Sequence, residues 1–257
     1  MCELFGVSST KKIRCNDMLE EFFSHADTNP HGWGIATFYE NTVSVEKEPV
    51  SAIESVYLKN RLTVDIMEDR LLAHIRRASK GQVEYKNTHP FFMRDNSGRL
   101  WTLIHNGNIF ESAELTTYTY LQPGNTDSER ILYYLVDMIN RKTAEVGSPL
   151  TDMERFDVVE EVIKVITPEN KVNLIIDDGE LFYVHTNQKG TLHRYQSGKS
   201  LAVSTKPLSK GRWEEIPINI LYAYKKGILQ YTGEKHGNEY IQDEKKEREL
   251  FLDYAQL

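Results

Sequence analysis

Cys2 is one of only two cysteines in this 257-residue chain, and it stands directly behind the initiator methionine. Removal of Met1 would leave Cys2 with a free α-amine beside its thiol. An α-amine titrates at about 7.7–8.0 and a free thiol at about 8.5, so the two groups are matched for proton transfer. The position therefore predicts a self-contained nucleophile and base. The alternative is a cysteine that stands there by chance.

The second cysteine and the eight histidines leave another interpretation open, in which Cys2 or Cys15 works with a histidine as a cysteine peptidase. We expect Cys15 to be a small core residue, because two cysteines in a chain of this length make no disulfide framework. No His/His or Cys/His pair has the i, i+3 or i, i+4 spacing of a helical metal site. We therefore expect neither a metal nor a cofactor.

Composition and charge exclude several classes of partner. The chain has 38 acidic and 31 basic residues and a net charge of -7, and no basic face interleaved with aromatic residues, so nucleic acid is not an expected partner. No stretch approaches the roughly 20 apolar residues of a membrane span, and no signal peptide is recognisable. We expect a cytoplasmic protein with no membrane contact. The absence of linkers and repeats predicts a single domain over 1–257, with a charged tail or helix from about residue 235.

Runs of apolar or alternating residues predict strands on both sides of a central pair of helices. Ser or Thr stands three positions before Glu at 51–54, 126–129 and 151–154, which is the capping pattern of a helix start. This order favours an α+β fold of two mainly antiparallel sheets covered by helices over a βαβ alternation. The predicted strands are CELFGVSS, GIATFY, RLLAHIRRA and LWTLIHNG before the long helices, and VNLII, LFYVHT, TLHRY, LAVST, NILYAY and ILQYT after them.

Several turns are also predicted. Asp178-Gly179 and Lys226-Gly227 separate pairs of predicted strands and are typical of hairpins. Asn106-Gly107, taken alone, is typical of a type I′ hairpin turn as well.

Five further stretches combine polar residues with glycines or a helix start. They are HGWGI (31–35), AHIRRASKG (73–81), NTHPFF (87–92), IHNGNI (104–109) and GNTDSERI (124–131). Together with Cys2 they resemble the class II glutamine amidotransferases, a family of N-terminal-nucleophile hydrolases, and above all its stand-alone glutaminase-domain type. The resemblance runs from Cys2 to about Trp213 and weakens after residue 140. It implies a four-layer αββα sandwich of two mainly antiparallel sheets flanked by helices.

The resemblance also implies roles for individual residues. Cys2 would attack the side-chain amide of glutamine, and Asn106 with Gly107 would stabilise the oxyanion. Arg76 matches the arginine that clamps the substrate carboxylate, and Asp127 matches the acid that receives its ammonium. His105 and Ser79 lie in the same motifs and are candidate substrate contacts. Arg77 and Lys80 depart from the tryptophan and histidine of relatives that carry a synthase domain.

The implied substrate is glutamine or another γ-glutamyl amide, and the implied products are ammonia or an amine and then glutamate. We expect no synthase domain in this chain, so that either a separate synthase subunit accepts the ammonia or the protein is a hydrolase. A homo-oligomer is a further expectation. Two alternatives stay open. One is a non-catalytic regulatory subunit that binds glutamine, and the other is a γ-glutamyl peptide hydrolase in thiol metabolism.

Overall fold

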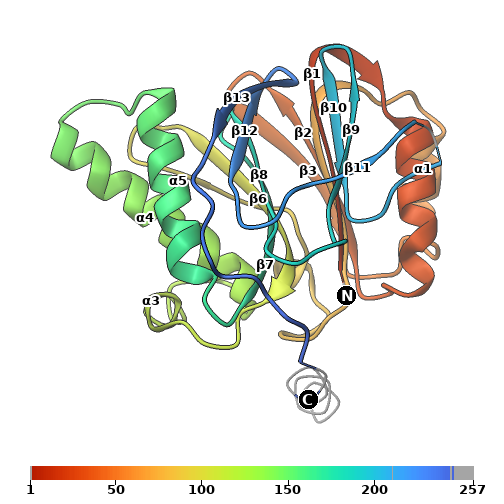
Figure 1. The fold of residues 1–257 in the computed structure, drawn as a ribbon. Helices are drawn as coiled ribbons and strands as arrows, with labels where there is room; N and C mark the ends of the chain where they lie inside the picture. The colour runs from red at the N-terminus through yellow and green to blue at the C-terminus, as the bar shows by residue number, and fades with distance from the viewer. Residues whose placement is uncertain (1, 210, 244, 246–257) are drawn as a thin grey trace.

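The computed structural model describes residues 2–209, 211–243 and 245, and in this part of the chain the strands form two sheets (Figure 1). Every ladder in both sheets is antiparallel. The first sheet runs in the order β11 (Glu214–Glu215), β9 (His193–Ser197), β10 (Ser200–Ser204), β1 (Glu3–Arg14), β4 (Met67–Ile75), β2 (Trp33–Tyr39) and β3 (Thr42–Glu48). The second runs β13 (Ile228–Thr232), β12 (Tyr222–Lys225), β8 (Phe182–His185), β7 (Lys171–Asp177), β6 (Leu100–Asn108) and β5 (Phe91–Arg94).

Helices cover the outer face of each sheet (Figure 1). On one side, α1 (Asn16–Ser24) and α2 (Val56–Leu62) pack on the first sheet through a core that includes Phe22, Leu58 and Phe5. On the other, α4 (Asp127–Val146) and α5 (Asp152–Ile166) pack on the second sheet. The remaining helical segments are short: η1 (His25–Asp27), η2 (Tyr85–Asn87) and α3 (Ala113–Thr116). The expected four-layer αββα sandwich is confirmed.

A third core lies between the two sheets, and the strand periodicity explains it. Alternate residues of a strand point to opposite faces, so Leu4 of β1 and Leu72 of β4 face Ile104 of β6 and Ile175 of β7 in this interlayer core. The sheets approach closely here. A Cβ added at Gly6 would stand 2.7 Å from a ring carbon of Phe182 in the opposite sheet.

Two of the three helix starts predicted from capping patterns are confirmed. The Thr151 and Glu154 side chains each bind the other's backbone N–H, forming a complete capping box at α5, and Thr126 caps α4 through the Glu129 amide. The helix expected from residue 51 begins later. Residues 51–54 form a turn, and Ser55 is the residue that caps α2. Ser55 Oγ accepts a hydrogen bond from the Leu58 N–H at 2.9 Å, so Ser55, and not Ser51, is the N-cap residue of α2.

Three other expectations concern turns, the core and the tail. The hairpin at Lys226-Gly227 joins β12 to β13, and both residues have positive φ, as a type I′ turn requires. Cys15 is fully buried in the core beneath α1, as predicted. The charged tail lies mostly outside the described residues. None of the described helices has the length and apolar character needed to cross a bilayer.

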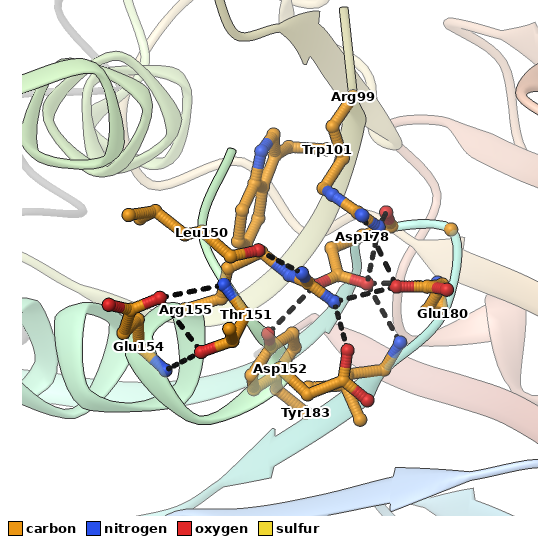
Figure 2. Close-up of polar contacts among 12 residues, drawn as sticks. Arg99, Trp101, Leu150, Thr151, Asp152, Glu154, Arg155, Asp178, Glu180 and Tyr183 are labelled. Carbon is orange, nitrogen blue, oxygen red and sulfur yellow. Dashed lines mark hydrogen bonds and ion pairs between the residues drawn. The ribbon is translucent and has the colours of Figure 1, made fainter. Parts of the chain in front are cut away.

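A buried arginine ties α5 to the turn between β7 and β8 (Figure 2). Arg155 donates to Asp178 Oδ2 at 2.7 Å, to the Leu150 carbonyl at 2.8 Å and to Asp152 Oδ1 at 2.9 Å. The side chains of Arg155 and Asp178 are almost wholly buried, and Tyr183 Oη also donates to Asp178 at 2.8 Å. The network holds α5 on the second sheet, and α4 packs beside α5 in the same layer.

Loss of one partner from this network should be costly. We expect Arg155→Met to lower the free energy of unfolding by about 3–5 kcal/mol, because it leaves the buried Asp178 carboxylate without its main counter-charge. Urea titration would measure this. The matched control is Arg141→Met, which breaks an exposed i, i+4 pair with Asp137 and should cost no more than about 0.5 kcal/mol. Equal losses in the two variants would contradict the structural role of Arg155.

Candidate active site

Cys2 immediately precedes the central strand β1 and is half-buried. The backbone N–H of Arg77 donates to Cys2 Sγ at 3.3 Å, and the thiol lies 3.4 Å from the Arg77 carbonyl. The next residue, Glu3, is buried, and its carboxylate contacts His25 Nδ1 at 2.9 Å and Lys206 Nζ at 2.5 Å. These contacts hold the start of β1, and the pairing of Glu3 with Ile75 places it against the end of β4.

Burial raises the pKa of the Cys2 thiol above its ordinary value. The hydrogen bond from the Arg77 backbone and the positive charge of Arg76 act in the opposite direction, and the negative charge of Asp127 raises the pKa further. The sulfur thus lies within electrostatic reach of one buried cation and one buried anion. A thiol in these surroundings needs a base to become a nucleophile.

Arg76 is buried and organises the loop that follows β4. Its backbone N–H donates to the Gly32 carbonyl at 2.8 Å. Its guanidinium donates to the carbonyls of Lys80, Gly81 and Gln82, each at 2.9 Å. Gly81 has φ of +73°, a conformation that favours glycine. The structure thus gives Arg76 a role in shaping residues 77–82, and the carboxylate clamp expected from the sequence stays a prediction.

The same loop docks on the end of β6. Ser79 Oγ donates to Asn108 Oδ1 at 2.6 Å, and Lys80 Nζ donates to the Ile109 carbonyl. Asp127 meets this segment from the other side, because its Oδ2 accepts from the Ile109 N–H at 2.8 Å. The loop after β4, the end of β6 and the start of α4 therefore form one hydrogen-bonded unit.

Asp127 is the first residue of α4 and is 5% exposed. Its Oδ1 accepts from the Ser128 N–H at 2.8 Å. Both oxygens therefore already accept a backbone hydrogen bond, and the Ser128 hydroxyl also lies 3.3 Å from Oδ1. The helix start favours an acid whether or not a ligand is present. The ammonium contact expected for Asp127 stays a prediction.

Asn106 and Gly107 lie inside β6, paired with Asn173 and Val172 of β7. The hairpin turn that Asn-Gly alone would suggest is therefore wrong. The ladder is so close here that a Cβ on Gly107 would stand 1.9 Å from the Lys171 carbonyl oxygen. Glycine is required by this approach of two backbones. The oxyanion role of the pair stays a prediction.

His105 is buried on the side of β6 that faces α4. Its Nδ1 lies 2.9 Å from Ser128 Oγ and its Nε2 lies 3.3 Å from the Lys171 carbonyl. Burial lowers its pKa, so the ring is held neutral. Its expected contact with substrate stays a prediction, since these bonds give the ring a place in the α4–β6–β7 packing.

The structure brings Arg76 and Asp127 within electrostatic reach of Cys2 and joins Ser79 and Asn108 directly. Sequence reasoning missed the Arg77 backbone as the group that holds the sulfur. Backbone contacts carry no residue-type signal, so no motif could have indicated it. It also missed the hydrogen bond of Lys80 to the Ile109 carbonyl, because a lysine in a sequence is usually expected at the surface.

The charge of Asp127 makes a testable contribution to the thiol. The thiolate is the reactive form, so the rate of alkylation by iodoacetamide rises with pH through the thiol pKa. Asp127→Asn removes a negative charge that raises this pKa, and we expect the midpoint of the pH profile to move to lower pH. Asp137→Asn, farther along α4, is the control and should leave the midpoint in place. A move to higher pH in Asp127→Asn would contradict the arrangement.

Comparisons with known proteins agree with this geometry. A family profile described as "Glutamine amidotransferases class-II" matches residues 1–196. A Haemophilus influenzae protein, provisionally named a glutamine amidotransferase, is 30% identical over 206 residues, which are 78% of this chain and 68% of that protein. The similarly named YafJ of Escherichia coli is 30% identical over 193 residues, 73% of this chain and 74% of its own.

Solved structures show the same fold. The predicted glutamine amidotransferase from Pseudomonas aeruginosa superposes with a TM-score of 0.62 at 19% identity, covering 90% of this chain and all of that one. The glutamine phosphoribosylpyrophosphate amidotransferase from B. subtilis gives a TM-score of 0.68 at 15% identity, covering 93% of this chain and 50% of that one. At these identities the likeness concerns the fold alone.

Proposed function

Since the chain belongs to the class II glutamine amidotransferases, we propose that it hydrolyses the γ-amide of glutamine or of another γ-glutamyl amide, with Cys2 as the nucleophile. The observation that carries the proposal is the position of the thiol: the sulfur is held by the Arg77 backbone, and a buried cation, Arg76, and a buried anion, Asp127, lie within its electrostatic reach. An α-amino acid head group presents a carboxylate and an ammonium, and this pair of charges complements it.

The proposed reaction needs only groups of this chain. The α-amine that removal of Met1 would free takes the thiol proton, and the thiolate attacks the amide carbonyl. The oxyanion is stabilised by the Asn106 side chain and the Gly107 N–H. The protonated amine then gives its proton to the leaving ammonia or amine, and a γ-glutamyl thioester remains. Water hydrolyses the thioester to glutamate and regenerates the thiol.

The loop of residues 77–82 has a place in this proposal. Arg76 holds the carbonyls of 80–82, and Ser79 and Lys80 bind the end of β6. Because the same loop supplies the N–H that contacts Cys2 Sγ, its position sets the sulfur relative to Asn106. The rate should therefore depend on this loop as well as on the nucleophile.

Substitution of the nucleophile tests the proposal. We expect Cys2→Ala to reduce release of ammonia and glutamate from glutamine to background, with little change in melting temperature because Cys2 is only half-buried. Cys15→Ala is the matched control, since Cys15 is buried beneath α1, and it should keep its turnover. Intact mass measurement would report in parallel whether Met1 is removed.

Two outcomes would point elsewhere. Glutamine binding by calorimetry without glutamate release from a protein that lacks Met1 would favour the non-catalytic binding subunit. Turnover that survives in Cys2→Ala and is lost in Cys15→Ala would favour the peptidase-like alternative.

A further inference from the structure

We propose that His74 is a positioning residue for the oxyanion-binding pair Asn106–Gly107, acting through the backbone carbonyl of His105. The inference rests on the proposed function, and it assigns a task to a side chain that the proposed reaction does not use.

His74 makes a hydrogen bond from one sheet to the other. It lies on β4 of the first sheet, is 0% exposed, and its Nε2 stands 3.2 Å from the carbonyl oxygen of His105 on β6 of the second. A carbonyl oxygen can only accept, so Nε2 carries the hydrogen and Nδ1 is bare. Within the described residues, Nδ1 has no hydrogen-bond partner. The ring therefore makes one directional bond, and that bond ends on β6.

The accepting carbonyl belongs to the peptide that joins His105 to Asn106. A peptide unit is planar, so fixing its oxygen fixes the plane in which the chain enters Asn106. The following residue, Gly107, has no side chain that could be packed to hold the backbone. The orientation of the two proposed oxyanion donors consequently depends on hydrogen bonds to the backbone, and His74 supplies the one from the opposite sheet.

The plane of the His74 ring is itself fixed. His89 stacks on it with ring centroids 4.1 Å apart and an interplanar angle of 28°, and Phe91 packs on His89 at 4.5 Å. The His89 carbonyl lies 2.1 Å from where a Cβ on Gly34 would stand, so only glycine there lets His89 reach this place. Gly34, His89, His74 and Asn106 come from four of the sequence motifs, and this stack joins them.

The alternative that His74 transfers protons is disfavoured by its environment. Burial, with a smaller contribution from the charge of Arg76, lowers the pKa of His74 to about 3, although the hydrogen bond to the His105 backbone acts in the opposite direction. At neutral pH the ring is an uncharged donor. Its contribution is therefore geometric and should not depend on pH between 6 and 9.

The amides of Gln and Asn separate this task from general packing. A Gln side chain places its N–H₂ near the position of histidine Nε2, and an Asn side chain places it near Nδ1. We expect His74→Asn to lower kcat for glutamine by about 10- to 100-fold, below the full loss of an oxyanion donor, with KM within about threefold. His74→Gln should recover most of the wild-type kcat. Alkylation of Cys2 by iodoacetamide, which forms no oxyanion, should proceed at the wild-type rate in both.

His193→Gln is the control for loss of a half-buried imidazole that contacts a backbone carbonyl. His193 lies on β9, which β10 separates from β1, and its Nδ1 stands 3.1 Å from the Thr205 carbonyl oxygen. We expect wild-type kinetics from it. A measurement on the unsubstituted protein complements the variants: ¹⁵N NMR of labelled histidine should show the Nε2–H tautomer for His74. The Nδ1–H tautomer, or equal kcat in His74→Asn and His74→Gln, would overturn the inference.

The experiment separates the two proposals. An active wild-type protein whose His74→Asn variant keeps its kcat overturns the positioning role alone. A wild-type protein that lacks Met1 and releases no glutamate overturns the proposed function, and the positioning role with it.

Discussion

The apolar interface between the two sheets is the constraint on which the rest of the structure depends. Its inner faces carry residues such as Leu4, Leu72, Ile104 and Ile175, and a polar group placed among them is costly unless it is hydrogen-bonded. Polar groups are consequently gathered at the two ends of the interface. At one end Arg70 of β4 pairs with Asp177 of β7 at 2.8 Å, and burial raises the pKa of Asp177 to about 6 in spite of that pair.

At the other end the same constraint produces the candidate site. Strands β1, β4 and β6 bring Cys2, Arg76 and Asn106 to this end, where the thiol of Cys2 and the guanidinium of Arg76 are hydrogen-bonded to neighbouring backbone groups. The guanidinium of Arg76 donates to carbonyls of the loop, and the carboxylate of Asp127 accepts from the N–H of Ile109, just after β6, and from the N–H of Ser128 in α4. The site is therefore built mainly from side-chain-to-backbone bonds, which fix the chain geometry before any ligand binds.

The sequence predicted the fold class and the main elements because they rest on periodicity and capping, which are local. Thr151 and Glu154 announce α5 by the residues that cap it. By contrast, α1 begins at Asn16, and its N-cap residue Cys15 makes no side-chain capping bond, so the capping pattern could not predict this helix. Gly107 was ambiguous for a different reason. Asn-Gly favours a turn locally, and only the approach of β7 explains why glycine stands within a strand.

The candidate residues were predicted from motifs, and their partners were not. The motif around Arg76 indicates a functional arginine, but its three carbonyl acceptors are set by the path of the following loop. His74 lay within the same motif and had no predicted partner across the sheets. Such contacts depend on which strands face each other, and that is a property of the whole fold.

Three glycines that stand at close contacts, Gly6, Gly34 and Gly107, differ in the substitutions that they would allow over evolutionary time. At Gly6 the obstacle to a larger residue is the far end of the Phe182 ring, so a smaller partner could make room and the two positions should covary among homologues. At Gly34 and Gly107 the obstacles are the carbonyl oxygens of His89 and Lys171. No exchange of side chains can move a backbone oxygen out of the way. We therefore expect these two positions to stay glycine in every lineage that keeps this sandwich.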